Sequence, residues 1–209
     1  MCNTFVLSVD FVKIKTFMTI RKATKRDIAT IVDIHIQRFS TFFLSSLGKP
    51  FLKTFYTAFL KYPALLIVVE DEGTVKGFAA GSRDNRSFFK KLLMNNFLCF
   101  TVQGIQVLFN NPSALRRMAS NAGKSEKNNL IFAELLSIAT IRNKKGYGKA
   151  LLNEFEREVA KENSLNLPIS LTTDYDDNEK AIQFYKDCGY RIHEVFHSYQ
   201  GRKMYRFIK

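Results

Sequence analysis

Residues 142–149 combine basic side chains with two glycines, a composition suited to binding an anion. The stretch reads RNKKGYGK, and it lies between an apolar, β-branched run at 131–140 and a run with helical spacing from Ala150 onward. These runs predict a buried strand followed by an amphipathic helix. Glycine lets the backbone approach a ligand closely, and the first N–H groups of a helix have no partner within it. With the helix dipole, these amides predict a phosphate or pyrophosphate site.

Two better-known phosphate loops do not fit the same residues. A Walker loop needs a glycine at position 143 and a hydroxyl at position 150, where this chain has Asn143 and Ala150. The dinucleotide fingerprint needs a third glycine, which does not follow Gly146 and Gly148. A strand, a loop and a helix that only pack together remain the alternative for this segment.

Glu134 is a carboxylate within the otherwise apolar run at 131–140. Burial of a charge is costly unless it has a purpose or a partner. We predict that Glu134 is a general base, and a structural salt bridge to a nearby arginine is the alternative. Strict strand alternation would place four residues on one face, namely Glu134, Leu136, Ile138 and Thr140.

A second pattern lies at residues 169–190. It reads as a strand, a turn ending in Asn178, a helix that carries Tyr185, and an exit at Gly189 and Tyr190. In this order, the two segments resemble the GNAT family of N-acetyltransferases. The family's acetyl-CoA motif, [QR]-x-x-G-x-[GA], corresponds here to residues 143–148, with Asn143 where Gln or Arg is usual. The resemblance spans about residues 18–209.

The resemblance implies an acetyl-CoA-dependent N-acetyltransferase that uses no metal and transfers the acetyl group directly to an amine. The implied fold is α/β (α+β), with a single mixed, mostly antiparallel central sheet of about seven strands flanked by helices, and with a helical insert before the fourth strand. The implied acetyl-CoA contacts are Leu136, Ile138, Ala139, Thr140, Asn143, Lys144, Lys145, Gly146, Tyr147, Gly148, Lys149, Asn178 and Tyr185.

The resemblance also assigns roles within the site. Ile138 would contact the acetyl group and Thr140 the pantetheine, while the neighbouring strand splays away to admit the cosubstrate. Tyr185 would be the general acid, because a phenol with an ordinary pKa near 10 is protonated at neutral pH. A simple core aromatic is the alternative for Tyr185. The aromatic loop at 39–48 would form a wall of the acceptor site, and core packing is its alternative.

The apolar periodicity and turn residues predict the elements that position these groups. Strands are expected at 18–23, 64–70, 74–82, 130–140, 167–173, 190–197 and 202–208. Helices are expected at 26–38, 49–61, 146–163 and 177–187, with a helical block between 84 and 120. Asp71, Glu72 and Gly73 predict a tight hairpin turn, and Thr24 is the expected cap of the first helix.

Composition excludes several classes of protein. A chain of 209 residues with 46% hydrophobic and 13% aromatic residues predicts one folded domain rather than disorder. No apolar run is long enough to span a bilayer. Three scattered cysteines, Cys2, Cys99 and Cys188, predict neither a disulfide framework nor a metal site, so we expect a cytoplasmic protein. Residues 1–17 are expected to be an extension or a misassigned start, and residues 18–209 the domain.

The net charge of +13 raises the question of an anionic partner. The segment 84–128, our predicted basic helical insert, is longer than the family's usual connection and carries apolar faces flanked by Lys and Arg. It is expected to cover an anionic substrate, to touch an anionic membrane peripherally, or to pack on the sheet. Residues 39–59 and the lengthened insert resemble acetyltransferases of bacterial surface-polysaccharide synthesis, and this resemblance implies an amino-sugar nucleotide or other small molecule of that synthesis as the acceptor. A non-catalytic acyl-CoA-binding module is an alternative function. A nucleic-acid-binding protein is less favoured, because no recognition helix is evident. A monomer or a homodimer is expected.

Overall fold

The computed structural model describes residues 18–86, 88, 92, 131–141, 146–162, 167–198 and 201–209. In chain order, its elements are β1 (Thr19–Lys22), the 3-10 turn η1 (Lys25–Asp27), α1 (Ile28–Arg38), α2 (Phe43–Ser46), α3 (Gly48–Ala58), β2 (Ala64–Asp71), β3 (Thr74–Ser82), β4 (Ala133–Thr140), α7 (Tyr147–Glu162), β5 (Ile169–Asp174), α8 (Glu179–Asp187), β6 (Arg191–His197) and β7 (Lys203–Ile208). All seven strands predicted from the sequence are present.

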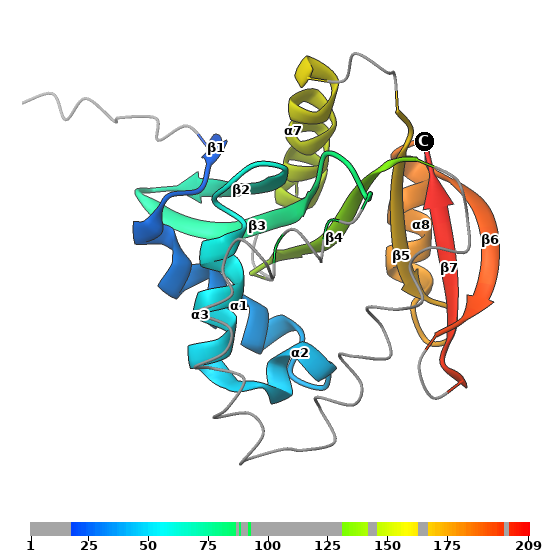
Figure 1. Cartoon of the computed structure of the whole chain (residues 1–209), viewed down its shortest axis with the longest axis horizontal. Coiled ribbons are helices and arrows are strands. Elements are labelled where there is room, and N and C mark those ends of the chain that lie inside the picture. Colours follow the sequence, from blue (N-terminus) through cyan, green and yellow to red (C-terminus); the bar gives the residue numbers. More distant parts are fainter. Residues whose placement is uncertain are drawn as a thin grey trace, which may run out of the picture.

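The strands form one mixed sheet in the order β1-β2-β3-β4-β5-β7-β6, shown in Figure 1. The neighbours β4 and β5 are parallel, and every other pair is antiparallel. The predicted turn between β2 and β3 is confirmed. Asp71 pairs with Thr74, and the two residues between them, Glu72 and Gly73, have φ angles of 53° and 70°. Positive φ at both positions belongs to the tight turn whose twist suits a hairpin.

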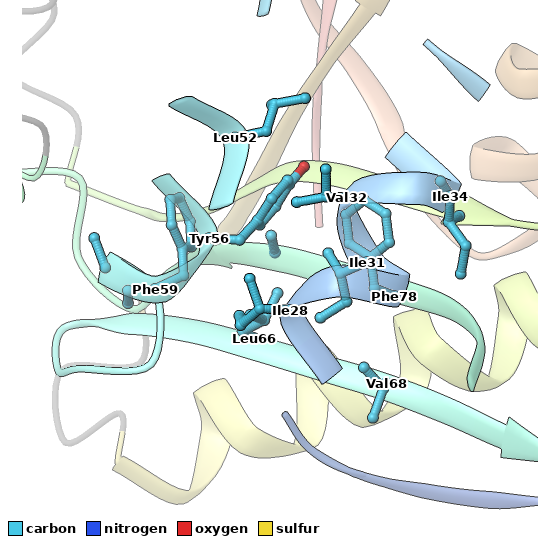
Figure 2. Close-up of a cluster of buried hydrophobic side chains, with 14 of the residues drawn as sticks. Ile28, Ile31, Val32, Ile34, Leu52, Tyr56, Phe59, Leu66, Val68 and Phe78 are labelled. Atoms are coloured by element: carbon cyan, nitrogen blue, oxygen red, sulfur yellow. The ribbon is translucent and has the colours of Figure 1, made fainter. Parts of the chain in front are cut away.

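Hydrophobic side chains on the two faces of the sheet form two cores. The first core lies under α1 and α3, and Figure 2 shows Tyr56 of α3 between Phe59, which directly follows α3, and Phe78 of β3. The second core lies under α7 and α8, with Phe155 of α7 fully buried. Since β2 and β3 alternate residues between these cores, their sequences are apolar on both faces.

The helices differ from the sequence-based expectation at their ends. The first helix begins with η1, in which the Asp27 carboxylate accepts hydrogen bonds from the backbone N–H and the hydroxyl of Thr24, at 2.7 and 2.9 Å. The expected loop at 39–48 contains the short helix α2, because Phe43 and Leu44 pack against the first core. Within the described residues, no helix is both long and apolar enough to cross a membrane.

The expected helical block between 84 and 120 lies largely outside the described residues. Phe88 and Leu92 are the exceptions beyond position 86, and both are buried in the first core. These two contacts agree with packing on the sheet for this part of the segment.

Candidate active site

The strands β4 and β5 pair over only a short stretch. Ala133, Glu134 and Leu135 lie opposite residues of β5, whereas β4 continues to Thr140 beside β3 and, among the described strands, has no partner on its other edge there. Figure 1 shows the two strands diverging beyond their paired ends. Backbone N–H and C=O groups need partners. The edge of β4 from 136 to 140 can therefore receive an extended ligand as if it were another strand, as the sequence-based prediction required.

A β-bulge interrupts β4 where this divergence begins. Ala80 of β3 pairs with Ser137 and Gly81 pairs with Leu135, so Leu136 is an extra residue. A Cβ on Gly81 would lie 2.2 Å from the backbone oxygen of Glu134, so this close approach of β3 to β4 requires glycine.

The bulge corrects the prediction that four alternate residues of β4 share one face. Leu136 packs with the first core and Ile138 with the second core, because one inserted residue reverses the alternation that follows it. Residues 136–140 of β4, the splayed section, therefore contribute Leu136 to the first core and Ile138 to the second core.

The glycine junction lies at the N-terminus of α7. Gly146 has a φ of +102°, and among the described residues beyond its chain neighbours and the backbone of α7, no heavy atom lies within 4 Å of the position that its Cβ would occupy. Tyr147 is buried, Gly148 faces the ring of Phe184, and Lys149 is exposed. The remaining predicted contacts of this loop, Asn143, Lys144 and Lys145, lie outside the described residues.

Glu134 is half-buried at the paired end of β4. Arg206 of β7 places Nη1 4.0 Å from its Oε1, longer than an ordinary hydrogen bond. The same guanidinium donates to Glu194 at 2.7 Å and to Ser170 at 3.3 Å. Burial raises the pKa of Glu134 above its usual value, and the nearby charge of Arg206 opposes this rise. The rise caused by burial is the larger of these two effects on the pKa of Glu134.

Tyr185 of α8 is buried in the second core, with 8% of its surface exposed. Its ring contacts those of Phe184, Tyr190 and Phe207. Burial raises the pKa of Tyr185 to about 12, so its phenol remains protonated at neutral pH. Ile138 of the splayed section packs against the same core. The structure thus places the predicted acid on the α7 and α8 side of β4.

The acetyltransferase (GNAT) family model matches residues 30–190 of the chain. The protein belongs to this family. As a GNAT protein it is an acetyltransferase whose acetyl donor is acetyl-CoA. No curated protein shows significant sequence similarity to the chain.

Solved structures share the GNAT fold at low sequence identity. The N-acetyltransferase from Staphylococcus aureus Mu50 aligns with a TM-score of 0.62 and 15% identity, over 91% of this chain and 100% of that chain. The structure of yncA from Salmonella typhimurium with its cofactor acetyl-CoA has a TM-score of 0.59 and 16% identity, over 92% of each chain. NAA60 from Arabidopsis thaliana in complex with acetyl-CoA has a TM-score of 0.55 and 15% identity, over 92% of this chain and 98% of that chain.

Asn178, a predicted acetyl-CoA contact of the GNAT motif, caps the N-terminus of α8. Its side-chain amide donates to the Thr173 hydroxyl at 2.5 Å and to the backbone oxygen of Asp174 at 3.4 Å. These bonds fix the turn between β5 and α8. In the described part of the chain, no group of His, Cys, Asp and Glu side chains has the arrangement of a metal site.

Sequence reasoning missed several polar residues that the fold brings to the site. Arg206 had no assigned role, and Asp71 was predicted only as part of the hairpin turn. His35, for which we predicted no role, is buried in the first core and bonded to Tyr56. No motif marks these residues, because their partners are remote in the sequence.

Proposed function

We propose that this GNAT protein transfers an acetyl group directly from acetyl-CoA to a primary amine, with Glu134 as the general base and Tyr185 as the general acid. The observation that carries the proposal is the divergence of β4 from β5 after Leu135, the residue that follows Glu134. The free edge of β4 begins after Leu135. A ligand bound along this edge would have Glu134 near one end of it and Ile138 beside its middle.

The residues present fit acetyl-CoA. The free edge of β4 offers backbone groups to the amides of the pantetheine arm, and the open space at Gly146 admits the pyrophosphate to the N-terminus of α7. Acetyl-CoA supplies the activated acetyl thioester. A backbone N–H of the splayed section can polarise its carbonyl group.

Glu134 and Tyr185 can manage the two protons of the reaction. The carboxylate of Glu134 accepts a proton from the amine, directly or through water, and its raised pKa makes it a better base than an exposed carboxylate. Tyr185 holds its proton at neutral pH and can donate it to the departing sulfur. Glu134 lies on β4 and Tyr185 on α8, so one residue would act as the base and the other as the acid.

An amino-sugar nucleotide, or another small molecule of surface-polysaccharide synthesis, is the acceptor that we propose. Phe42, in the loop after α1, is 37% exposed and lies 4.8 Å from the guanidinium of Arg202, just before β7. An aromatic surface can stack on a sugar ring, and a guanidinium can pair with a phosphate. Arg202 is also paired with Asp174, which holds its position.

The alternative is a structural function for both proposed catalytic groups, because both have structural neighbours. Glu134 lies near Arg206, and Tyr185 lies within an aromatic core. Acetyl transfer would then proceed without a proton donor or acceptor at these two positions.

Binding and turnover separate these functions. Acetyl-CoA should raise the melting temperature, because a ligand at 100 times its Kd stabilises the native state by about 2.7 kcal/mol. CoA release with a panel of nucleotide-linked amino sugars and simple amines should identify an active acceptor. Glu134→Gln should lower kcat by roughly 10²-fold or more while acetyl-CoA still raises the melting temperature. CoA release by Glu134→Gln at the rate of the unaltered protein would favour the structural function of Glu134.

Membrane contact and assembly need separate measurements. We propose peripheral contact of the basic segment 84–128 with anionic lipid, and either a monomer or a homodimer in solution. Flotation with vesicles that contain anionic lipid should carry the protein upward at moderate salt, whereas neutral vesicles should not. Light scattering determines the number of chains.

A further inference from the structure

Three polar side chains from three elements meet beneath β4. Nδ1 of His35, on α1, lies 2.7 Å from the hydroxyl of Tyr56, on α3. Burial raises the pKa of Tyr56, and Ser137 of β4, which also interacts with this hydroxyl, lowers it. Figure 2 shows the Tyr56 side chain extending from α3 into the first core. The result is a chain of polar contacts that ends on the splayed strand.

This chain is deeply buried. Tyr56 has 0% and His35 has 3% of its surface exposed. Within the described part of the protein, Nε2 of His35 has no hydrogen-bond partner. Burial lowers the pKa of His35 to about 4, so the ring is neutral near pH 7. Burial removes polar groups from water, which costs free energy that their mutual hydrogen bonds only partly offset. Apolar side chains of the same shape would therefore stabilise the core as well or better. A role in positioning another group is a better account of them.

The group that they hold lies next to the bulge. Ser137 pairs with Ala80 and directly follows Leu136, the inserted residue of β4. A bulge changes the direction of the peptide groups on both sides of it and disrupts the local ladder. The interaction with Tyr56 ties the residue after the bulge to a helix on one face of the sheet. The Leu136 side chain also packs on this face.

We propose that Tyr56 and His35 are positioning residues that hold the bulge at Leu136 and Ser137, and so set the direction of the peptide groups that face the acetyl donor. The inference rests on the proposed acetyl transfer for its effect on rate. Its structural part, the control of the bulge by the buried chain, can be measured without turnover.

The test compares Tyr56→Phe with Val68→Ala. Tyr56→Phe removes only the hydroxyl, whereas Val68→Ala creates a cavity at a fully buried position of β2 in the same core and is a control for lost stability. For each variant, kcat, the KM for acetyl-CoA, the unfolding free energy and the amide resonances of residues 136–138 are measured. Ser137→Ala removes the same interaction from its other end and replaces Tyr56→Phe if that variant does not fold.

We expect Tyr56→Phe to lower kcat by about tenfold or more, because small errors in orientation are costly in rate, and to leave the KM for acetyl-CoA nearly unchanged. The amide resonances of residues 136–138 should shift in Tyr56→Phe and stay in place in Val68→Ala. His35→Asn, which keeps a polar group near the position of Nδ1, should retain more of kcat than His35→Leu.

Two results would overturn the inference or separate it from the proposed function. Equal kcat in Tyr56→Phe and Val68→Ala, with unmoved resonances at 136–138, contradicts a positioning role. If the unaltered protein releases no CoA with any amine, the proposed function fails. The resonances alone then decide whether Tyr56 controls the bulge.

Discussion

The hydroxyl of Tyr147 donates a hydrogen bond to Oδ2 of Asp71 at 2.5 Å, across 76 positions of the chain. Tyr147 is the first residue of α7, between the two glycines of the anion-binding junction, and Asp71 ends β2. Both side chains are buried, with 3% and 5% of their surfaces exposed. This bond therefore fixes the N-terminus of α7 to the hairpin of β2 and β3.

Loss of this bond should weaken acetyl-CoA binding. A buried hydrogen bond to a charged group contributes about 1.5–3 kcal/mol. Asp71→Asn and Tyr147→Phe each weaken or remove this bond and free the start of α7 to move. Each variant should therefore raise the KM for acetyl-CoA by about tenfold. The kcat at saturation should remain, because neither residue takes part in proton transfer. Steady-state kinetics measure both constants. Glu72→Gln, at the exposed neighbouring position, is the control and should behave as the unaltered protein.

The pH dependence of the rate should report on Glu134. A base must be deprotonated, so kcat/KM should fall as the pH drops through the raised pKa of Glu134. Arg206 lowers this pKa. Arg206→Met should therefore raise it further and move the acidic limb of the profile to higher pH.

Arg157→Met is the control for this experiment, because Arg157 is paired with Glu154 on the surface of α7. Its pH profile should match that of the unaltered protein. An acidic limb that stays in place or moves to lower pH in Arg206→Met would contradict the role of Glu134.

Tyr185→Phe should separate catalysis from binding. Removal of a general acid costs about 10²-fold or more in kcat, whereas the KM for acetyl-CoA should change little because the ring remains. Tyr190→Phe removes the hydroxyl of another tyrosine buried in the second core and should retain kcat. A Tyr185→Phe variant with unaltered turnover would leave Tyr185 as a core aromatic only.

Stability should fall in mild acid because of His35. Burial lowers the folded-state pKa of this imidazole from 6.5 to about 4. Below pH 6.5 the unfolded chain binds a proton that the folded chain resists, so the free energy of unfolding falls as the pH drops from about 6.5 to 4, by up to about 3 kcal/mol. Urea titrations at several pH values measure this loss.

His35→Asn should remove most of this slope, since the asparagine side chain does not titrate. His193→Asn alters an exposed histidine of β6 and should keep the slope. An identical pH dependence in His35→Asn and the unaltered protein would show that other groups are responsible.

The sequence alone determined the strands, the four longer helices of the described residues, and their order. Hydrophobic period and turn residues act locally, so the seven strands and the turn at Glu72 and Gly73 were predictable. The glycine junction and the segment that contains Tyr185 predicted the GNAT family and the fold, which the family match and the sheet order confirm.

The tertiary structure decided which side chains share a face and which remote residues meet. Strand alternation assumes one residue per step, and the extra residue Leu136 depends on how β3 pairs with β4, at the glycine that permits their close approach. The contacts of Tyr147 with Asp71 and of Glu134 with Arg206 join segments that no local pattern links. Local preferences act over a few residues, whereas these contacts depend on how the whole chain packs.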